Sequence, residues 1–285
     1  MGSRGIASLN KAGPGRKPSR KSLPTPFVQA FRAQMSIAMA TVDPGSGKRL
    51  GNCIGIYCFF DYDGEPIYVG QTTRSFTDRI GRHLTGQRSD TVAYRILDPF
   101  EVAEMQLWPM TFDKNTPKLE RARAVDQAEY SVYEWAVRTS EFKAILNEKL
   151  PLGVPDVDMP AVTRRFNLVP EDLRGEREHP DVRIARRAET LARLTAVAHE
   201  RGEVSDGLRR VIVIQAIRIA YLAAKRLAFA EGDRDAPPAS AIDMAALVGR
   251  RLAAGAVSIA DLEDGADDAI SQSAPDEAAE QTAAE

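Results

Sequence analysis

Residues 54–72 read IGIYCFFDYDGEPIYVGQT and decide the fold of this 285-residue chain. The apolar run over 54–60 suits a buried strand, and 66–72 suits a second strand. Between them, residues 61–65 hold an Asp-Gly pair among other turn-forming residues, which favours a tight connection. We therefore predict a β-hairpin with one tyrosine on each strand, Tyr57 and Tyr68.

A helix with an arginine and a histidine is predicted directly after the hairpin. Ser75 opens it, and Asp78 follows three residues later in a capping-box arrangement. Apolar residues recur every four positions from Phe76, and Arg79 and His83 share a face beside this stripe. Arginine binds phosphate oxygens and histidine exchanges a proton near neutral pH. Taken alone, however, the pair is more typical of a solvated helix face.

A carboxylate on a later helix is the next candidate. The helix is predicted to start with Thr116 as its capping hydroxyl and Pro117 at its first position. Glu129 then lies at the edge of the apolar stripe, while Glu134 points to the opposite side. A carboxylate that faces the core has to be paired, protonated or bound to a cation, and Mg²⁺ suits oxygen ligands. The simpler alternative is a salt bridge to an arginine such as Arg79.

Composition separates the chain into regions more clearly than it indicates a function. The hydrophobic share of 44% is ordinary, and the net charge of −2 gives no sign of overall basicity. The N-terminal 26 residues nevertheless contain six Lys or Arg and no acid, whereas the C-terminal end is acidic. We predict a disordered basic arm, 1–26; a domain with an N-terminal helix, 27–150; a linker, 151–182; a helical region, 183–260; and a disordered acidic tail, 261–285.

Other features bear on compartment and partners. Cys53 and Cys58 suggest free core thiols in a reducing compartment, and no secretory or membrane-spanning segment is visible. We expect a cytoplasmic protein without a membrane partner. Five basic residues decorate the long apolar helix expected over 205–231, and we expect them on the solvated side of a core or dimer helix rather than on a DNA-facing ridge. They are Arg209, Arg210, Arg218, Lys225 and Arg226. If this helix is a dimer helix, the protein forms a homodimer through its C-terminal helices.

Together the two glycine-tyrosine tags, the Arg/His helix and the Glu helix resemble the GIY-YIG nuclease family over about residues 52–150. The second tag reads Tyr-Val-Gly rather than Tyr-Ile-Gly, and the interval from Glu129 to Asn147 is longer than is usual in the family. The resemblance implies a small α/β domain in which helices flank a three-stranded antiparallel sheet. It also implies a metal-dependent endonuclease that hydrolyses phosphodiester bonds of DNA.

The resemblance assigns proton chemistry to three side chains. Tyr57 would act as the general base or orient the attacking water, and Tyr68 would assist it or bind phosphate. His83 would accept or relay the proton. Whether Tyr57 or His83 is the base stays open, because a relay through both satisfies the same chemistry.

The remaining roles concern charge and support. Arg79 would stabilise charge on the scissile phosphate, Glu129 would hold a single Mg²⁺ or Mn²⁺, and Asn147 would brace the site through hydrogen bonds. The alternative is a catalytically weak GIY-YIG-like module that binds nucleic acid or protein. A degenerate copy would be expected to lose Arg79 or Glu129 first, and both are present.

Overall fold

A computed structural model of the chain describes residues 25–85, 96–151, 159–160, 164–232 and 238–248. The predicted basic arm up to residue 24 and the predicted acidic tail lie outside these ranges. The strands are β1 (Ile54–Phe60), β2 (Pro66–Thr72), β3 (Glu104–Met110) and β4 (Arg164–Asn167). The α-helices are α1 (Pro26–Ala40), α2 (Phe76–Thr85), α4 (Lys118–Thr139), α5 (Glu171–Glu178), α6 (Pro180–Arg201), α7 (Asp206–Ala230) and α8 (Met244–Val248). Short 3₁₀ turns are η1 (Leu50–Asn52), η2 (Pro99–Glu101) and η3 (Ala239–Ala241).

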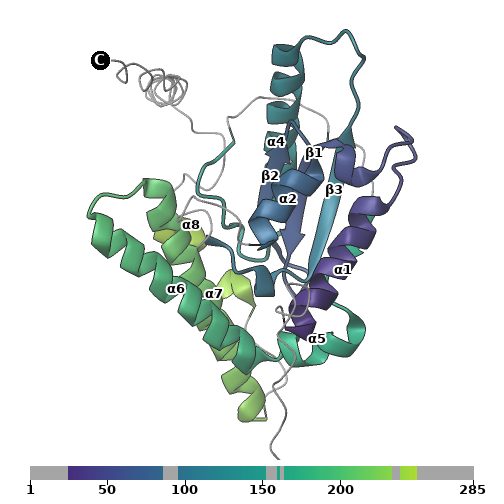
Figure 1. The fold of residues 1–285 in the computed structure, drawn as a ribbon. Helices are drawn as coiled ribbons and strands as arrows, with labels where there is room; N and C mark the ends of the chain where they lie inside the picture. The colour runs from purple at the N-terminus through teal and green to yellow at the C-terminus, as the bar shows by residue number, and fades with distance from the viewer. Residues whose placement is uncertain (1–24, 86–95, 152–158, 161–163, 233–237, 249–285) are drawn as a thin grey trace, which may run out of the picture.

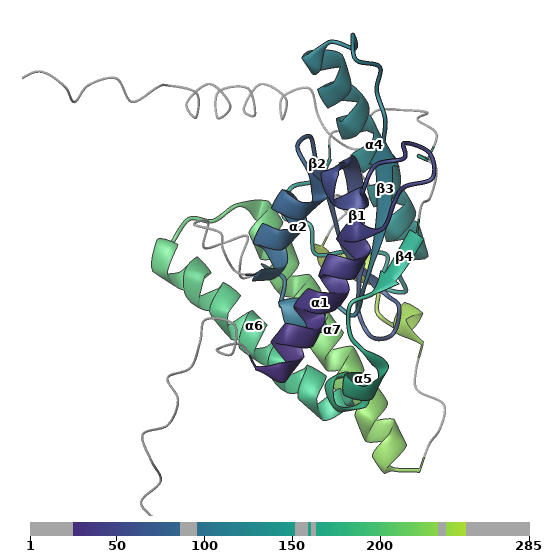
Figure 2. The same ribbon diagram turned by 45° about the vertical axis from the view of Figure 1, so that its right-hand side comes forward.

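The strands form one antiparallel sheet in the order β2-β1-β3-β4 (Figures 1 and 2). The predicted α/β class, an antiparallel sheet flanked by helices, is confirmed, and within the described residues the sheet has a fourth strand beside the three that were expected. No pattern in the sequence indicated β4, which reads Arg-Arg-Phe-Asn and buries none of its four residues fully. It lies in the segment 151–182 that was predicted to be a linker, as does α5.

The hairpin β1–β2 forms as its turn chemistry predicts. The Asp61 carboxylate accepts hydrogen bonds from the amides of Asp63 and Glu65, at 2.9 and 3.1 Å. Gly64 adopts a φ of 75°, a conformation in which a residue without a Cβ is favoured. The turn is thus fixed by one buried aspartate and one glycine.

The two faces of the sheet are covered by different helices (Figures 1 and 2). Tyr57 and Phe59 pack into a large apolar cluster with residues of α1, α2, α6 and α7. Ile56, Cys58 and Phe60 point the other way and pack against α4. Successive residues of a strand alternate between faces, so α2 and α4 approach β1 from opposite sides. Both cysteines are buried and free, as predicted.

The two helices nearest the hairpin start differently. Ser75 caps α2, since its hydroxyl accepts a hydrogen bond from the amide of Asp78 at 3.1 Å, as predicted. In α4 the cap position is taken by Pro117, which makes no side-chain hydrogen bond there. The prediction of Thr116 as the cap was wrong, because the extended Pro117 places Thr116 one residue outside the helix.

The C-terminal helices pack on the same core as the sheet. Leu194 of α6 and Val211 of α7 belong to the cluster that contains Tyr57.

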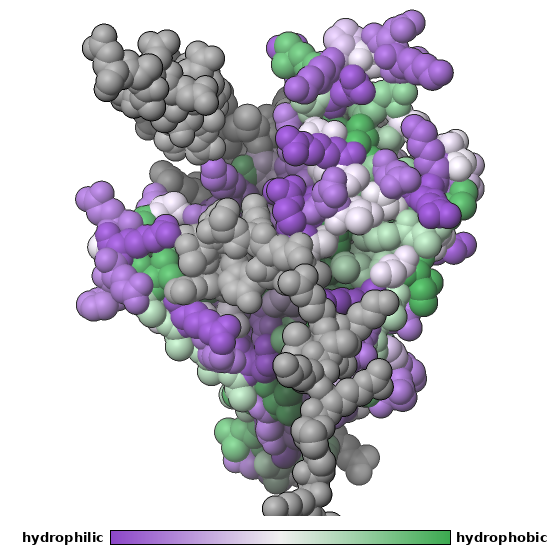
Figure 3. Space-filling view, in the orientation of Figure 1, coloured by the Kyte–Doolittle hydropathy of each residue, from purple (hydrophilic) through white to green (hydrophobic). Residues whose placement is uncertain are grey.

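Within the described part of the chain, no helix is long and apolar enough to cross a membrane. On the face shown in Figure 3, hydrophilic side chains predominate among the described residues. Homodimerisation through α6 and α7 stays a prediction.

Candidate active site

The two tyrosines of the hairpin lie on neighbouring strands and on one face of the sheet. Tyr57 pairs with Gly70 across the β1–β2 ladder, and Phe59 pairs with Tyr68. A Cβ at position 70 would collide with the ring and hydroxyl of Tyr57. Gly70 is therefore required so that the Tyr57 phenol can lie across β2, which gives this tag glycine a specific physical reason.

Helix α2 adds His83 to the same group. The His83 ring centre lies 5.9 Å from that of Tyr57 and 5.5 Å from that of Tyr68, and the two tyrosine rings are 6.3 Å apart. The predicted stripe of Phe76, Ile80 and Leu84 is buried beneath the helix. This anchoring directs the adjacent face of α2 at the hairpin, so the His83 ring lies beside both tyrosine rings.

Burial changes the electrostatics of the group. Tyr57 is fully buried, and this burial, reinforced by Tyr68, raises the pKa of its phenol well above the usual value. Burial also disfavours the charged form of Arg79, but the phenol oxygens of Tyr57 and Tyr68 outweigh it and raise the arginine pKa. At neutral pH the site therefore holds a neutral phenol beside a guanidinium.

Three buried polar atoms in this region lack a hydrogen-bond partner among the described residues. They are the hydroxyl of Tyr57, Nε of Arg79 and Oε1 of Gln71. Folded proteins rarely leave such groups unsatisfied, since each costs free energy. The Tyr57 hydroxyl still interacts with the Arg79 guanidinium, and Glu101, Arg183 and Arg218 near the hairpin turn carry such atoms too. The combination of these atoms with the two tyrosines and His83, rather than the atoms alone, marks the region as a candidate site.

Glu129 lies on α4 and interacts electrostatically with Tyr57 and Arg79. Burial raises the pKa of Glu129 to about 7; the neighbouring Asp126 adds to the rise, while Gln71 and Arg79 oppose it. Gln71 also donates a hydrogen bond to Asp126 at 2.6 Å. Glu134 instead acts on the pKa of Tyr130 and Tyr133, away from the site. Glu129 thus acts on the Tyr57 and Arg79 group, as predicted, whereas the outward direction of Glu134 stays a prediction, since its exposure is intermediate like that of Glu129.

Asn147 lies beside β2 rather than among the rings. Its side chain accepts a hydrogen bond from the Val69 amide at 3.0 Å and donates one to the Val69 carbonyl at 2.8 Å. Leu146 continues the contact through its amide, which donates to the Ile67 carbonyl at 2.8 Å. Asn147 thereby satisfies the open edge of β2 between Tyr68 and Gly70, and both ends of its amide are occupied by the protein.

This arrangement has a counterpart among known families. Residues 53–136 match the family model of the GIY-YIG catalytic domain. The match covers less than a third of the chain and contains five of the six predicted site residues; it stops short of Asn147. The family is one of nucleases, so the match indicates a nuclease acting on nucleic acid. Searches of curated proteins and of solved structures gave no significant match.

The segment that matches the GIY-YIG model offers Glu129 as its candidate metal ligand. The described residues contain no group of three or more Asp, Glu, His or Cys side chains placed to share a metal ion. Mg²⁺ commonly binds through one or two carboxylates and keeps several waters. A half-buried carboxylate with a raised pKa gains from a nearby cation, so Glu129 fits a single, largely hydrated divalent ion.

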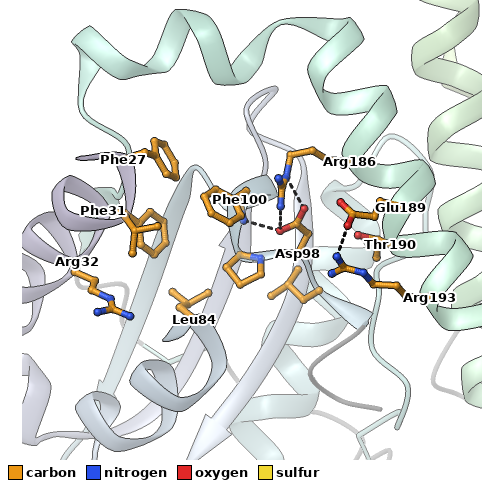
Figure 4. A pocket seen from close by; sticks show the side chains of 13 residues that line it. Phe27, Phe31, Arg32, Leu84, Asp98, Phe100, Arg186, Glu189, Thr190 and Arg193 are labelled. Atoms are coloured by element: carbon orange, nitrogen blue, oxygen red, sulfur yellow. Dashed lines mark hydrogen bonds and ion pairs between the residues drawn. The ribbon is translucent and has the colours of Figure 1, made fainter. Parts of the chain in front are cut away.

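A separate cavity of about 390 Å³ lies beyond the end of α2, between α1, η2 and α6 (Figure 4). Its walls interact with one another. The rings of Phe27 and Phe100 stack with their centres 5.2 Å apart, and Cζ of Arg186 lies 4.1 Å from the centre of the Phe100 ring. Arg186 also donates two hydrogen bonds to Asp98. Leu84 from α2 also lines the cavity. The Phe100 ring and the charges of Asp98 and Arg186 are thus already engaged with one another.

Sequence reasoning did not single out Gln71 or Asp126 as neighbours of Glu129. A usable signal was present: Gln71 lies two residues after Val69 and so shares its face of β2, which α4 covers. Asp126 and Glu129 are three residues apart and share a face of α4. Together these spacings place the three polar side chains at one edge of the sheet.

Proposed function

We propose that the chain is a metal-dependent endonuclease that hydrolyses phosphodiester bonds of DNA. The observation that carries the proposal is the convergence of Tyr57, Tyr68 and His83 beside Arg79, whose buried Nε has no hydrogen-bond partner among the described residues. A phosphate oxygen supplies what Arg79 lacks, because a guanidinium binds phosphate through directed hydrogen bonds. The same contact places the phosphorus atom beside the rings.

Proton transfer falls to His83 in this proposal. The raised pKa of Tyr57 keeps its phenol protonated near neutral pH, so Tyr57 is a poor base by itself. Its hydroxyl instead orients the attacking water and passes a proton toward His83. The water oxygen forms a bond to phosphorus, the bond from phosphorus to the leaving oxygen breaks, and the water proton ends on His83. The leaving oxygen departs with the electron pair of the broken bond and takes a proton from solvent.

Charge on the phosphate is shared between two sides of the site. Arg79 stabilises the non-bridging oxygens as negative charge builds on them. Glu129 would hold one Mg²⁺ or Mn²⁺, and such an ion would supply positive charge to offset the charge that develops in the reaction. Gln71 and Asp126 fix the surroundings of Glu129, and Asn147 holds β2 in place.

The decisive experiment tests the choice of substrate and the requirement for a metal ion independently. Purified protein is incubated with supercoiled plasmid and with an RNA of matched length, each with Mg²⁺, with Mn²⁺ or with EDTA. We expect nicked or linear plasmid with either metal, none with EDTA, and slower or no RNA cleavage. A His83→Ala sample purified in the same way controls for contaminating nuclease.

Two outcomes would contradict this function. Equal plasmid cleavage in EDTA would remove the metal from the proposal. Tight DNA binding without cleavage under every metal condition would favour the alternative, a catalytically weak binding module.

A further inference from the structure

The helices outside the matched segment are joined to the hairpin at two places, and the first is its turn. The Asp61 carboxylate accepts hydrogen bonds from Arg183, Arg187 and Arg218 at 3.2, 2.9 and 2.7 Å. All four side chains are buried. The turn that follows Tyr57 on β1 is therefore held by both α6 and α7, through charges that are costly to separate.

The second junction is the loop that carries Asn147. Arg210 of α7 donates hydrogen bonds to the backbone carbonyls of Asn147 and Glu148, at 2.8 and 2.9 Å. A Cβ at Gly207 would collide with the Glu148 carbonyl, so α7 touches the loop backbone directly at that glycine. Ser205, the α7 cap residue, also donates to the Glu148 carboxylate at 2.7 Å. The first turns of α7 thus contact both the backbone of this loop and the Glu148 side chain.

The loop passes this support on to the strand with the second tag. Asn147 uses both polar atoms of its side chain on Val69, whose neighbours in the chain are Tyr68 and Gly70. A continuous set of hydrogen bonds therefore runs from Arg210 through Asn147 to β2. In the described structure β2 is an edge strand, so β1 is its strand partner on one side and the Asn147 loop covers the other side.

We propose that Arg210, together with Gly207, is a positioning residue for the nuclease site, acting through Asn147 on β2. The inference rests on the proposed function and deepens it: a helix outside the GIY-YIG segment completes the support of the Tyr68 strand. Arg210 touches no reacting atom in this proposal. Its effect is to hold Tyr68 and Gly70 where Tyr57 and His83 need them.

A first test needs no catalytic activity. Hydrogen exchange of the Val69 amide is measured in the intact protein and in Arg210→Met, Arg210→Lys and Arg209→Met. Arg209 is the exposed neighbour on the same helix and serves as the control. Loss of two charge-assisted hydrogen bonds should speed exchange at Val69 about ten-fold or more in Arg210→Met. Arg210→Lys should recover part of the protection, and Arg209→Met should match wild type.

A second test separates positioning from general stability. We expect Arg210→Met to lower kcat about ten-fold with little change in KM, at temperatures where its melting curve shows a folded protein. In an Asn147→Ala background the same substitution should cause little further loss, since both act through one path. Gly207→Ala should reproduce the effect without changing any charge.

The outcomes distinguish this inference from the proposed function. Unchanged Val69 exchange in both Arg210→Met and Gly207→Ala would overturn the positioning role even if the protein cleaves DNA. Fully additive losses of kcat with Asn147→Ala would overturn it as well. If wild type cleaves nothing, the proposed function fails, and accelerated Val69 exchange would still support the structural link.

Discussion

The β1–β2 hairpin has buried polar groups at both ends, and the partners of these groups differ between the two ends. At the turn, Asp61 and Glu101 are matched by arginines of α6 and α7, with Arg187 bonded to both acids at 2.9 and 2.7 Å. Buried polar atoms without a hydrogen-bond partner occur at both ends, in Glu101, Arg183 and Arg218 at the turn and in Tyr57 and Arg79 at the other end. The difference lies in the ion pairs: the arginines at the turn face carboxylates, whereas Arg79 makes no ion pair within the described residues. A buried charge that the protein pairs is costly to separate, and one that it leaves unpaired is available to a charged ligand. The hairpin therefore carries an anchor at its turn and a candidate site at its other end.

The strongest test of the anchor is Asp61→Asn. It leaves three buried arginines facing a reduced negative charge, which should lower the free energy of unfolding by about 3–5 kcal/mol. Chemical denaturation of the variant beside an exposed control, Asp113→Asn, measures the difference. A loss no larger than that of the control would mean that the cluster is not an anchor.

At the site end, Arg79→Lys tests whether Arg79 is needed for cleavage but not for stability. Lysine keeps the charge but lacks the planar fork that binds phosphate oxygens, so cleavage should fall about 10- to 100-fold. The melting temperature should hardly change, because Arg79 makes no ion pair within the described residues. Arg82→Lys on the exposed side of α2 is the matched control. Equal rates for the two variants would remove Arg79 from phosphate binding.

The pH dependence of Tyr57→Phe tests the proton assignment. Burial favours the neutral phenol and raises its pKa above the usual value, so Tyr57 does not titrate below about pH 10. The ratio of wild-type to Tyr57→Phe cleavage rates should therefore stay constant from about pH 6 to 9, whereas His83→Ala should change the shape of the profile. A Tyr57→Phe ratio that climbs with pH in this range would make the phenol the base.

The smallest expected effect belongs to the basic arm. Deleting residues 2–24 keeps Thr25, which precedes α1, and removes six basic residues. DNA binding should weaken several-fold, and its salt dependence should flatten by roughly 0.9 for each phosphate that the arm neutralises. Sequence preference should stay the same. An unchanged salt slope, measured by fluorescence anisotropy, would show that the arm does not touch DNA.

Local periodicity was sufficient to predict the hairpin, the α2 stripe and the inward register of Glu129. These features depend on residues close in sequence, where spacing reports which face a side chain occupies. The same reasoning missed β4, because a four-residue strand with three polar positions carries no alternating apolar pattern.

The anchor was missed for a different reason. Arg218 was expected on a solvated helix face, yet it is 1% exposed and bonded to Asp61. An arginine in an apolar helix is normally solvated, and its acidic partner lies more than 150 residues earlier in the chain. Spacing along one helix cannot reveal such a partner, nor could it reveal that Arg210 of the same helix holds the Asn147 loop.

The contrast between anchor and site is tested most directly by Glu129→Gln, with melting and plasmid cleavage measured on the same sample at neutral pH. Burial raises the pKa of Glu129, so its charged form costs stability, and a neutral isostere should leave the melting temperature unchanged or higher. Cleavage should nevertheless fall at least about 100-fold. Glu134→Gln should cleave like wild type. A Glu129→Gln protein that melts several degrees earlier, or that cleaves at the wild-type rate, would contradict the separation of site from anchor.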